Sequence, residues 1–480
     1  MLRTILATTL SILSLTAISQ EKWDLERCVN YAMNNNLNIL QSKLNIERAD
    51  INYKQSRYNL LPNLNAGASY GFNFGQRIDP FTNQFAQGQV SSGNLFLSSS
   101  VDLFNALSKV KAVRSNEANL EASKFDLENI KNDISLQLCL FYLQILLNKE
   151  NVEIAQQQVA ITENQVERTR QLVEAGSAPQ GDLYDTEAQL AQEELNLTNA
   201  QNQVRLSTLN LTQLLQLEYE ESQEFDVVNP DLTDEGVELL NNTSQDIYVR
   251  AKQLMPEIKA AEARRIAAEY DVSSARGRLY PTLSLSGSLG SGYSGNNREQ
   301  IGDGSIEFIE IGEAINANAG EAYPVVVPQV SLGESDFRTK RIGDQLEDNF
   351  NQNLQLGLTI PIFNGNSAKA NLNRAKVNQI DADITYSQIT NQLRFDIEQA
   401  YADAKAAMNS YISAEKAVKA LDESFKYAEV RYEQNVINAV EYNNIKTQYT
   451  QAQSEMVRAK YTFVFRTKIL DFYLGKPIEL

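Results

Sequence analysis

The sequence predicts a mainly α-helical chain with membrane-crossing β-strands, built twice from a unit of helix, two strands, long helix and helix. Three observations predict this fold class. The chain starts with an export signal, it matches itself in two registers, and each half has two alternating strands before a long stretch without glycine or proline. Only 22 glycines and 10 prolines occur in 480 residues, which also favours long helices.

The composition excludes several classes of function. The chain has no histidine, which excludes an imidazole base, a histidine metal ligand and a Ser-His-Asp triad. Its two cysteines, Cys28 and Cys139, lie far apart and form no metal-binding motif. The 43 basic and 61 acidic side chains give a net charge of −18, which disfavours nucleic acid as a partner. We therefore expect no enzyme, no cofactor and no nucleic-acid partner.

The first residues are typical of an export signal. Arg3 supplies a short positive region, residues 5–18 are mostly apolar, and small residues precede Gln20. We predict a secretory signal peptide over residues 1–19, with a buried first helix as the alternative. Cys28 does not directly follow the apolar stretch, so no lipid anchor is expected.

The chain repeats itself, with one enlarged loop around 296–348. The matching segments are 101–106 with 360–365 and, in a second register, 60–64 with 279–283. The sequence therefore predicts three parts: a first repeat over 20–217, a connector over 218–246 and a second repeat over 247–480.

Each repeat is expected to open with a polar helix that ends before a proline, Pro62 or Pro281, because proline cannot continue the helical hydrogen-bond ladder. The predicted strands are 63–75, 94–105, 282–293 and 349–363. The predicted long helices are 107–175 and 366–434, and the shorter helices that follow them are 182–217 and 441–474.

The strands alternate between an apolar and a polar face. Over 63–75, leucine, alanine, tyrosine and phenylalanine alternate with asparagine, glycine and serine. Strands of this length fit a tilted bilayer crossing with one face to lipid and one to water, although a soluble sandwich alternates in the same way. Four strands cannot close a barrel, and an open edge in lipid leaves backbone groups unpaired. The chain is therefore expected to oligomerise.

The long helices carry two apolar stripes. One runs from Ile145 to Val173 and the other from Leu140 to Ile161, each with a period of seven residues. The stripes lie on nearly opposite flanks, so the helix is expected to contact a neighbour on each side. This favours a wall of helices, such as a closed tube. The alternative is a two-stranded coiled coil or a spectrin-like bundle.

Taken together, these residues resemble the TolC-like outer-membrane efflux proteins over essentially all of the mature chain. The resemblance is carried by the signal peptide, the duplicated element order and these motifs: Leu61-Pro62, Tyr280-Pro281, Leu103-Phe104-Asn105-Ala106, Ile362-Phe363-Asn364-Gly365 and residues 174–183. It implies a homotrimer with a twelve-stranded β-barrel in outer-membrane lipid, four strands from each chain, and an α-helical tunnel across the periplasm. It also implies contact with a periplasmic adaptor protein and an inner-membrane pump of the RND, ABC or MFS type.

The resemblance further implies a gate at the helix tips. An acidic ring would fall on Glu441 and Asn444, with Asp182 and Asp185 as the equivalents in the first repeat; Asn444 departs from the acidic pattern. Capping of a helix is the alternative role for Asp182. The tip turns, where the adaptor would bind, are Gly176 with Ser177 and Asn435 with Val436. The junctions between strands and helices are at Pro62, Phe104, Pro281 and Phe363.

One short motif is similar in sequence to a nucleotide-binding site. Residues 290–295 fit a dinucleotide-binding fingerprint, but no helix follows them, so we expect a loop. The function implied is a passive exit duct of an efflux or type I secretion system. The alternative is an exported helical scaffold without a transport role.

Overall fold

The computed structural model describes residues 22–83, 85–86, 88–230, 243–315, 318, 320–333, 336–434 and 436–476. The predicted signal peptide, residues 231–242 of the connector and the turn residue Asn435 lie outside the described residues. The chain divides into two compact units. Within the described residues, one unit comprises residues up to Asn52, Ser115–Glu269 and Val377 onward, and the other comprises Tyr53–Arg114 and Tyr270–Lys376.

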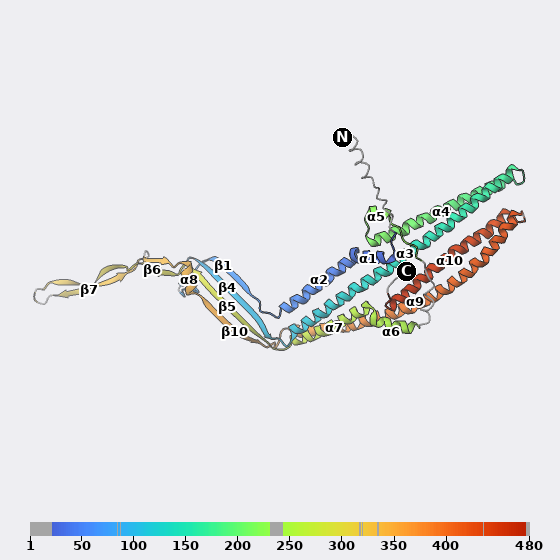
Figure 1. Ribbon diagram of the computed structural model, residues 1–480. Coiled ribbons are helices and arrows are strands. Elements are labelled where there is room, and N and C mark those ends of the chain that lie inside the picture. Colours follow the sequence, from blue (N-terminus) through green and yellow to red (C-terminus); the bar gives the residue numbers. More distant parts are fainter. Residues whose placement is uncertain are drawn as a thin grey trace, which may run out of the picture. The chain divides into compact units, whose positions relative to one another are not determined.

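The second unit is built around a four-stranded antiparallel sheet in the order β1-β4-β5-β10 (Figure 1). Its strands are β1 (Asn65–Phe74), β4 (Gln89–Phe104), β5 (Thr282–Ser294) and β10 (Asn351–Thr359). The two repeats meet at the centre of the sheet, where β4 pairs with β5, and β1 and β10 form the edges.

The strand limits differ from the predicted ones at several points. β4 starts at Gln89 rather than at residue 94, because its pairing continues to Phe74. β10 ends at Thr359 rather than at residue 363, because Pro361 has no N–H to donate to the ladder. The predicted loop over 290–295 is wrong: these residues continue β5 as far as Ser294, where alternating glycines and serines pair with β4.

The enlarged loop contains structure of its own. A short pair, β6 (Arg298–Gln300) with β9 (Phe337–Thr339), leads into a hairpin of β7 (Ser305–Ile315) and β8 (Ala322–Ser331). Helix α8 (Ile342–Asp348) then packs against β5. Among the described residues of the first repeat, the corresponding place holds the short pair β2 (Arg77–Ile78) and β3 (Phe85–Ala86).

The helices have the predicted order, with two breaks. The polar helix of the first repeat is split into α1 (Leu25–Asn35) and α2 (Leu37–Tyr58), because the Asn36 amide donates to Leu214 O at 3.0 Å and its Oδ1 accepts from Asn38 N. Its counterpart is split into α6 (Ser244–Leu254) and α7 (Pro256–Gly277), since the residue before a proline is driven into an extended conformation.

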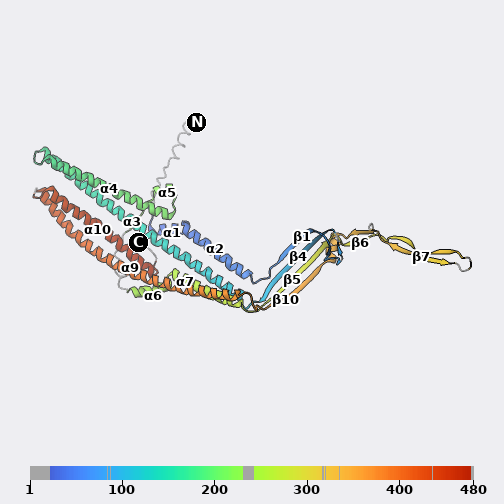
Figure 2. The same cartoon turned by 180° about the vertical axis from the view of Figure 1, so that it is seen from behind.

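Two long hairpins lie side by side, and most of their length belongs to the first unit (Figures 1 and 2). They are α3 (Ser108–Glu174) with α4 (Gln180–Leu215), and α9 (Ser367–Glu433) with α10 (Ala439–Tyr473). A short helix, α5 (Tyr219–Gln223), follows α4 in the connector. Cys28 and Cys139 are free and fully buried in the main core beside Leu138, Tyr142 and Leu211.

Among the described helices, α3 is the only one with an 18-residue stretch apolar enough to cross a membrane, and 39% of that stretch is buried in the structure. Leu138, Tyr142 and Ile145 of α3 belong to the main core. We therefore interpret the apolar character of α3 as that of a core helix.

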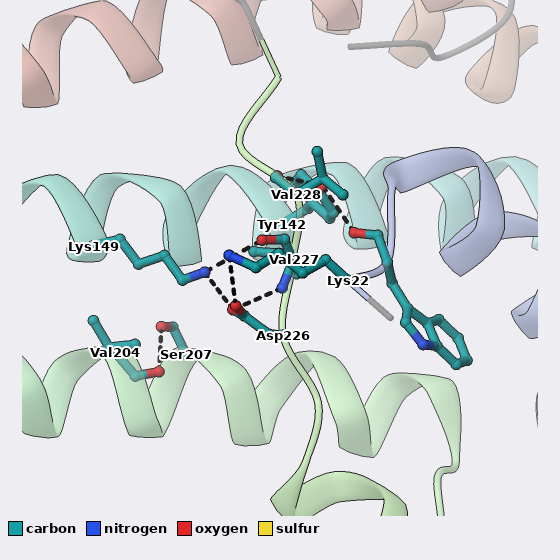
Figure 3. Close-up of polar contacts among 9 residues, drawn as sticks. Lys22, Tyr142, Lys149, Val204, Ser207, Asp226, Val227 and Val228 are labelled. Carbon is teal, nitrogen blue, oxygen red and sulfur yellow. Dashed lines mark hydrogen bonds and ion pairs between the residues drawn. The ribbon is translucent and has the colours of Figure 1, made fainter. Parts of the chain in front are cut away.

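The connector is tied to α3 by a polar cluster around Asp226 (Figure 3). Asp226 forms ion pairs with Lys149 of α3 and with Lys22, the latter at 3.2 Å. Tyr142 donates to Val228 O at 2.7 Å and to Trp23 O at 3.1 Å. Burial opposes ionisation of Asp226, but the hydrogen bond and charge of Lys149 outweigh it and lower the pKa of the carboxyl.

Candidate functional site

The four-stranded sheet has one apolar face that is largely exposed. Cross-strand partners share a face, so the pairs Leu97 with Leu289 and Leu285 with Leu356 belong to the same side. Leu354, Leu356 and Leu358 of β10 are each more than 60% exposed. An apolar surface of this kind on a soluble chain marks a contact with another protein or with lipid.

Aromatic rings gather on this face at the end where β1 and β5 finish, next to α8. Tyr70 and Tyr293 stack with ring centroids 6.3 Å apart on either side of Gly93, and Phe72 lies 5.6 Å from Tyr70. A Cβ at Gly93 would lie 3.4 Å from the Tyr70 ring, so the glycine leaves room for the rings. Aromatic girdles of this type flank the lipid-facing band of membrane barrels.

The opposite face of the sheet is polar. Two of its rows are Asn65-Ser98-Ser288-Asn353 and Ser100-Ser286-Gln355. Short neutral side chains of this type suit a surface in contact with water. The alternation thus separates an apolar side from a mainly polar side, on which Phe96 is one apolar exception.

The four predicted junction residues lie where strands meet helices. Pro62 and Pro281 precede β1 and β5, Phe104 ends β4, and Phe363 follows β10 and is 85% exposed. Residues with positive φ then turn the chain into the long helices: Ala106, Leu107, Gly365 and Asn366. At the first junction Lys109 pairs with Asp102 at 2.7 Å.

The tip of the first hairpin is closed by a glycine turn. Gly176 has φ of +74°, Gly176 N donates to Val173 O and Ser177 N donates to Leu172 O, at 2.9 and 2.8 Å. This is the pattern in which a left-handed residue ends a helix. In the second hairpin Val436 N donates to Arg431 O at 2.8 Å, which closes the tip in the same way.

The four candidate aperture residues take equivalent places on two helices. Asp182 and Asp185 lie on the exposed side of α4, and Glu441 and Asn444 lie on the exposed side of α10. Asp182 is not the N-cap of α4, which is Pro179, but it lies in the first turn, where a carboxylate interacts favourably with the helix N-terminus. In α10 the cap is Asn438, which accepts from Glu441 N at 2.8 Å.

The charge of Glu441 is partly balanced. Arg431 of α9 lies 3.6 Å away, and both side chains are about half exposed. An exposed pair of this kind contributes little to stability, because water and salt screen it. It does reduce the field that Glu441 presents at the tip.

Polar contacts join the two hairpins, and sequence reasoning missed them. Arg168 of α3 donates to Glu433 O at 2.8 Å, and its guanidinium lies 5.6 Å from the centre of the Tyr432 ring. Tyr432 stacks on Tyr442 with centroids 4.6 Å apart. Burial raises the pKa of the Tyr442 hydroxyl to about 12, so it stays neutral at physiological pH.

A buried lysine lies deeper between the hairpins. Lys446 is 2% exposed and donates to the Thr162 hydroxyl and, at 3.5 Å, to Gln158 O. Burial lowers the pKa of its ammonium group, while the charge of Glu193 acts in the opposite direction. The four-residue spacing of Tyr442 and Lys446 on one helix face was a signal in the sequence, but it did not reveal the partner across the interface.

Within the described residues, no group of three or more cysteine, aspartate or glutamate side chains is placed to hold a metal ion. The arrangement instead provides a polar strand surface and two hairpin tips joined by a hydrogen bond and a cation–π contact of Arg168.

Comparison with known proteins relates this architecture to outer-membrane channels. The family model for the outer membrane efflux protein matches residues 28–216 and 312–476. Outer membrane protein OprJ of Pseudomonas aeruginosa is 25% identical over 433 residues, covering 87% of this chain and 77% of the relative. A solved structure of CusC superimposes with a TM-score of 0.75 at 14% identity, covering 95% and 93% of the two chains. VceC from Vibrio cholerae gives 0.73 at 17% identity, covering 95% and 97%.

Proposed function

Because this chain belongs to the outer membrane efflux protein family, a family of non-enzymatic outer-membrane channels, we propose that three copies form the exit duct of a tripartite efflux or type I secretion system. The observation that carries the proposal is the sheet, with an exposed apolar face on one side and a polar face on the other. Lipid covers the first face and water fills the space enclosed by the second.

The number of strands supports a trimer. In the described part of the chain, β1 and β10 are the edges of the four-stranded sheet. In a bilayer their unpaired N–H and C=O groups each cost several kcal/mol, about as much as any buried polar group without a partner. When β10 of one copy pairs with β1 of the next, three copies close a barrel and satisfy every edge. The two long hairpins of each copy continue that barrel as a helical tunnel.

The tips of the hairpins are the gate. Glu441 and Asn444, with Asp182 and Asp185, lie on exposed helix faces within the first two turns of α10 and α4. In a trimer these positions line the narrow end of the tunnel, where carboxylates favour cations and retard anions. The bridge from Arg168 to Glu433 holds the second hairpin to the first in the closed state.

The exposed tip turns are the docking site for the partner proteins. Ser177 is exposed and Val436 is 62% exposed, and an apolar side chain at a helix tip fits contact with a periplasmic adaptor. The adaptor links the duct to an inner-membrane pump, which supplies the energy. The relatives include a cation efflux system protein, CusC, and a pyoverdine export protein, OpmQ, consistent with a duct whose cargo is chosen by its pump.

Reconstitution tests this function with a matched pair of variants on β10. The wild-type protein should be extracted by detergent as a trimer and should conduct ions in a planar bilayer. Leu356→Arg places a charge on the apolar face and costs about 2–4 kcal/mol per chain at the bilayer centre, so membrane insertion should fail. Gln355→Arg places the same charge on the polar face and should insert normally, with weaker cation preference. A soluble wild-type monomer without conductance, or equal insertion of the two variants, would refute the proposal.

A further inference from the structure

Phe96 interrupts the polar face of the sheet. It lies in the row Gly67-Phe96-Gly290-Asn351, whose cross-strand partners share one side. The adjacent rows on that side carry asparagine, serine and glycine. Phe96 is 45% exposed, so packing within the chain leaves much of the ring uncovered.

Glycine makes room for this ring. A Cβ on Gly67 would lie 2.4 Å from the Phe96 ring, closer than any real contact, so even alanine at that position would displace the ring. Gly290 flanks Phe96 on the other strand. The ring therefore lies over the backbone of Gly67 on the polar face, and nearly half of its surface is exposed.

A second ring reaches the same face from a loop. Phe81 lies between β2 and β3, and a Cβ on Gly292 would lie 1.9 Å from its ring. Gly292 is two residues beyond Gly290 on β5, hence on the same face, and it pairs with Asn94 in the row next to Phe96.

A buried carboxylate holds this loop in place. Asp79 is fully buried and accepts hydrogen bonds from Phe81 N at 2.9 Å, from Thr82 N at 3.1 Å and from the Ser294 hydroxyl. Ser294 lies two residues beyond Gly292, so the loop is fastened to the same strand that its ring covers. These three hydrogen bonds hold the turn between β2 and β3 against the end of β5.

We propose that Phe96 and Phe81 form a binding site for organic cations on the interior wall of the barrel. This inference rests on the proposed function, because only in a closed barrel does the polar face line the path of the cargo. The exposed face of an aromatic ring carries negative charge density and attracts cations within about 6 Å. Its apolar surface also binds hydrocarbon groups, so cations that carry aromatic groups gain from both effects. Three copies bring six such rings to the same level of the barrel.

The test is block of ion current by tetraphenylphosphonium added to the β2–β3 side of a single trimer in a planar bilayer. The wild-type channel should be blocked at lower concentrations of this ion than of tetramethylammonium, which has no aromatic group. Phe96→Leu and Phe81→Leu keep apolar volume but remove the ring, and each should weaken the block by about threefold to tenfold. Phe96→Tyr keeps a ring and should keep the block.

Phe72→Leu is the matched control, because Phe72 lies on the lipid-facing side and its loss should leave the block unchanged. Wild-type block by tetraphenylphosphonium in both leucine variants would overturn the aromatic site while leaving the channel function intact. Absence of potassium conductance in the wild-type protein would instead refute the channel function, and the binding site with it.

Discussion

Lys446 of α10 donates a hydrogen bond to the hydroxyl oxygen of Thr162 on α3, and both side chains are buried. The Thr162 hydroxyl in turn donates to Gln158 O at 2.7 Å. This chain of hydrogen bonds joins the second hairpin to the first at a level below the tips. It gives a buried ammonium group its partners, and without them that group would cost several kcal/mol.

The first prediction concerns this pair. Thr162→Val removes the acceptor and leaves the ammonium poorly paired, so the free energy of unfolding should fall by about 1–3 kcal/mol. Replacing both residues, Thr162→Val with Lys446→Met, should recover most of the loss, because an apolar pair of similar volume has no charge to solvate. Thermal unfolding of the detergent-solubilised protein measures both effects. A double variant as unstable as Thr162→Val alone would show that the buried charge is not the cause.

A second prediction concerns the contact between the hairpins at the tips. Arg168→Ser removes the hydrogen bond to Glu433 O and the contact with the Tyr432 ring, so the second hairpin is released and single-channel conductance should rise. Arg170→Ser is the matched control, because Arg170 pairs with Glu167 and Glu187, both on the first hairpin. Equal conductance of the two variants would show that the contact of Arg168 with Glu433 does not hold the channel closed.

A third prediction concerns the charge at the aperture. Glu441→Gln leaves Arg431 without its acidic partner, so cation preference and block by divalent cations should both weaken. Asn444→Asp adds a carboxylate one turn along the same exposed face and should strengthen both. Reversal potentials in asymmetric potassium chloride report the preference. Unchanged potentials in both variants would exclude these positions from the aperture.

A fourth prediction concerns pH and the cluster around Asp226. The folded-state pKa of Asp226 lies below that of the unfolded chain, so its contribution is fully present above about pH 4 and is lost as pH falls through the lowered pKa. Asp226→Asn should reduce the free energy of unfolding by about 1–2 kcal/mol at neutral pH. The difference from the wild-type protein should shrink below pH 4. A difference that stays constant from pH 7 to pH 3 would contradict the ionic role.

The fold class was predictable because two periodicities dominate the sequence. Alternation with period two in residues 63–75 and heptad stripes in the long helices each restrict the structure strongly. Family membership confirms the resemblance, the mixed helical and strand architecture and the outer-membrane location. The roles of Glu441, Asn444, Asp182 and Asp185 stay predictions.

Other features of the fold and the site depend on contacts between residues far apart in the sequence, which local sequence patterns do not predict. The helix break at Asn36 depends on Leu214, far away in the sequence, and the bridges from Arg168 and Lys446 depend on how the two hairpins meet. Phe96 is an exception to the apolar and polar alternation of its strand, and sequence reasoning did not single it out. Its place over Gly67 appears only when the register of β1 and β4 is known.

The central claim is that lipid covers one face of the sheet and water the other. Single spin labels placed at consecutive positions from Asn353 to Leu358 on β10 test this directly, since Cys28 and Cys139 are fully buried and react poorly. In reconstituted protein, accessibility to oxygen should peak at Leu354, Leu356 and Leu358. Accessibility to a water-soluble nickel complex should peak at the positions between them. Two profiles that rise and fall together, or that lack a period of two residues, would contradict the account.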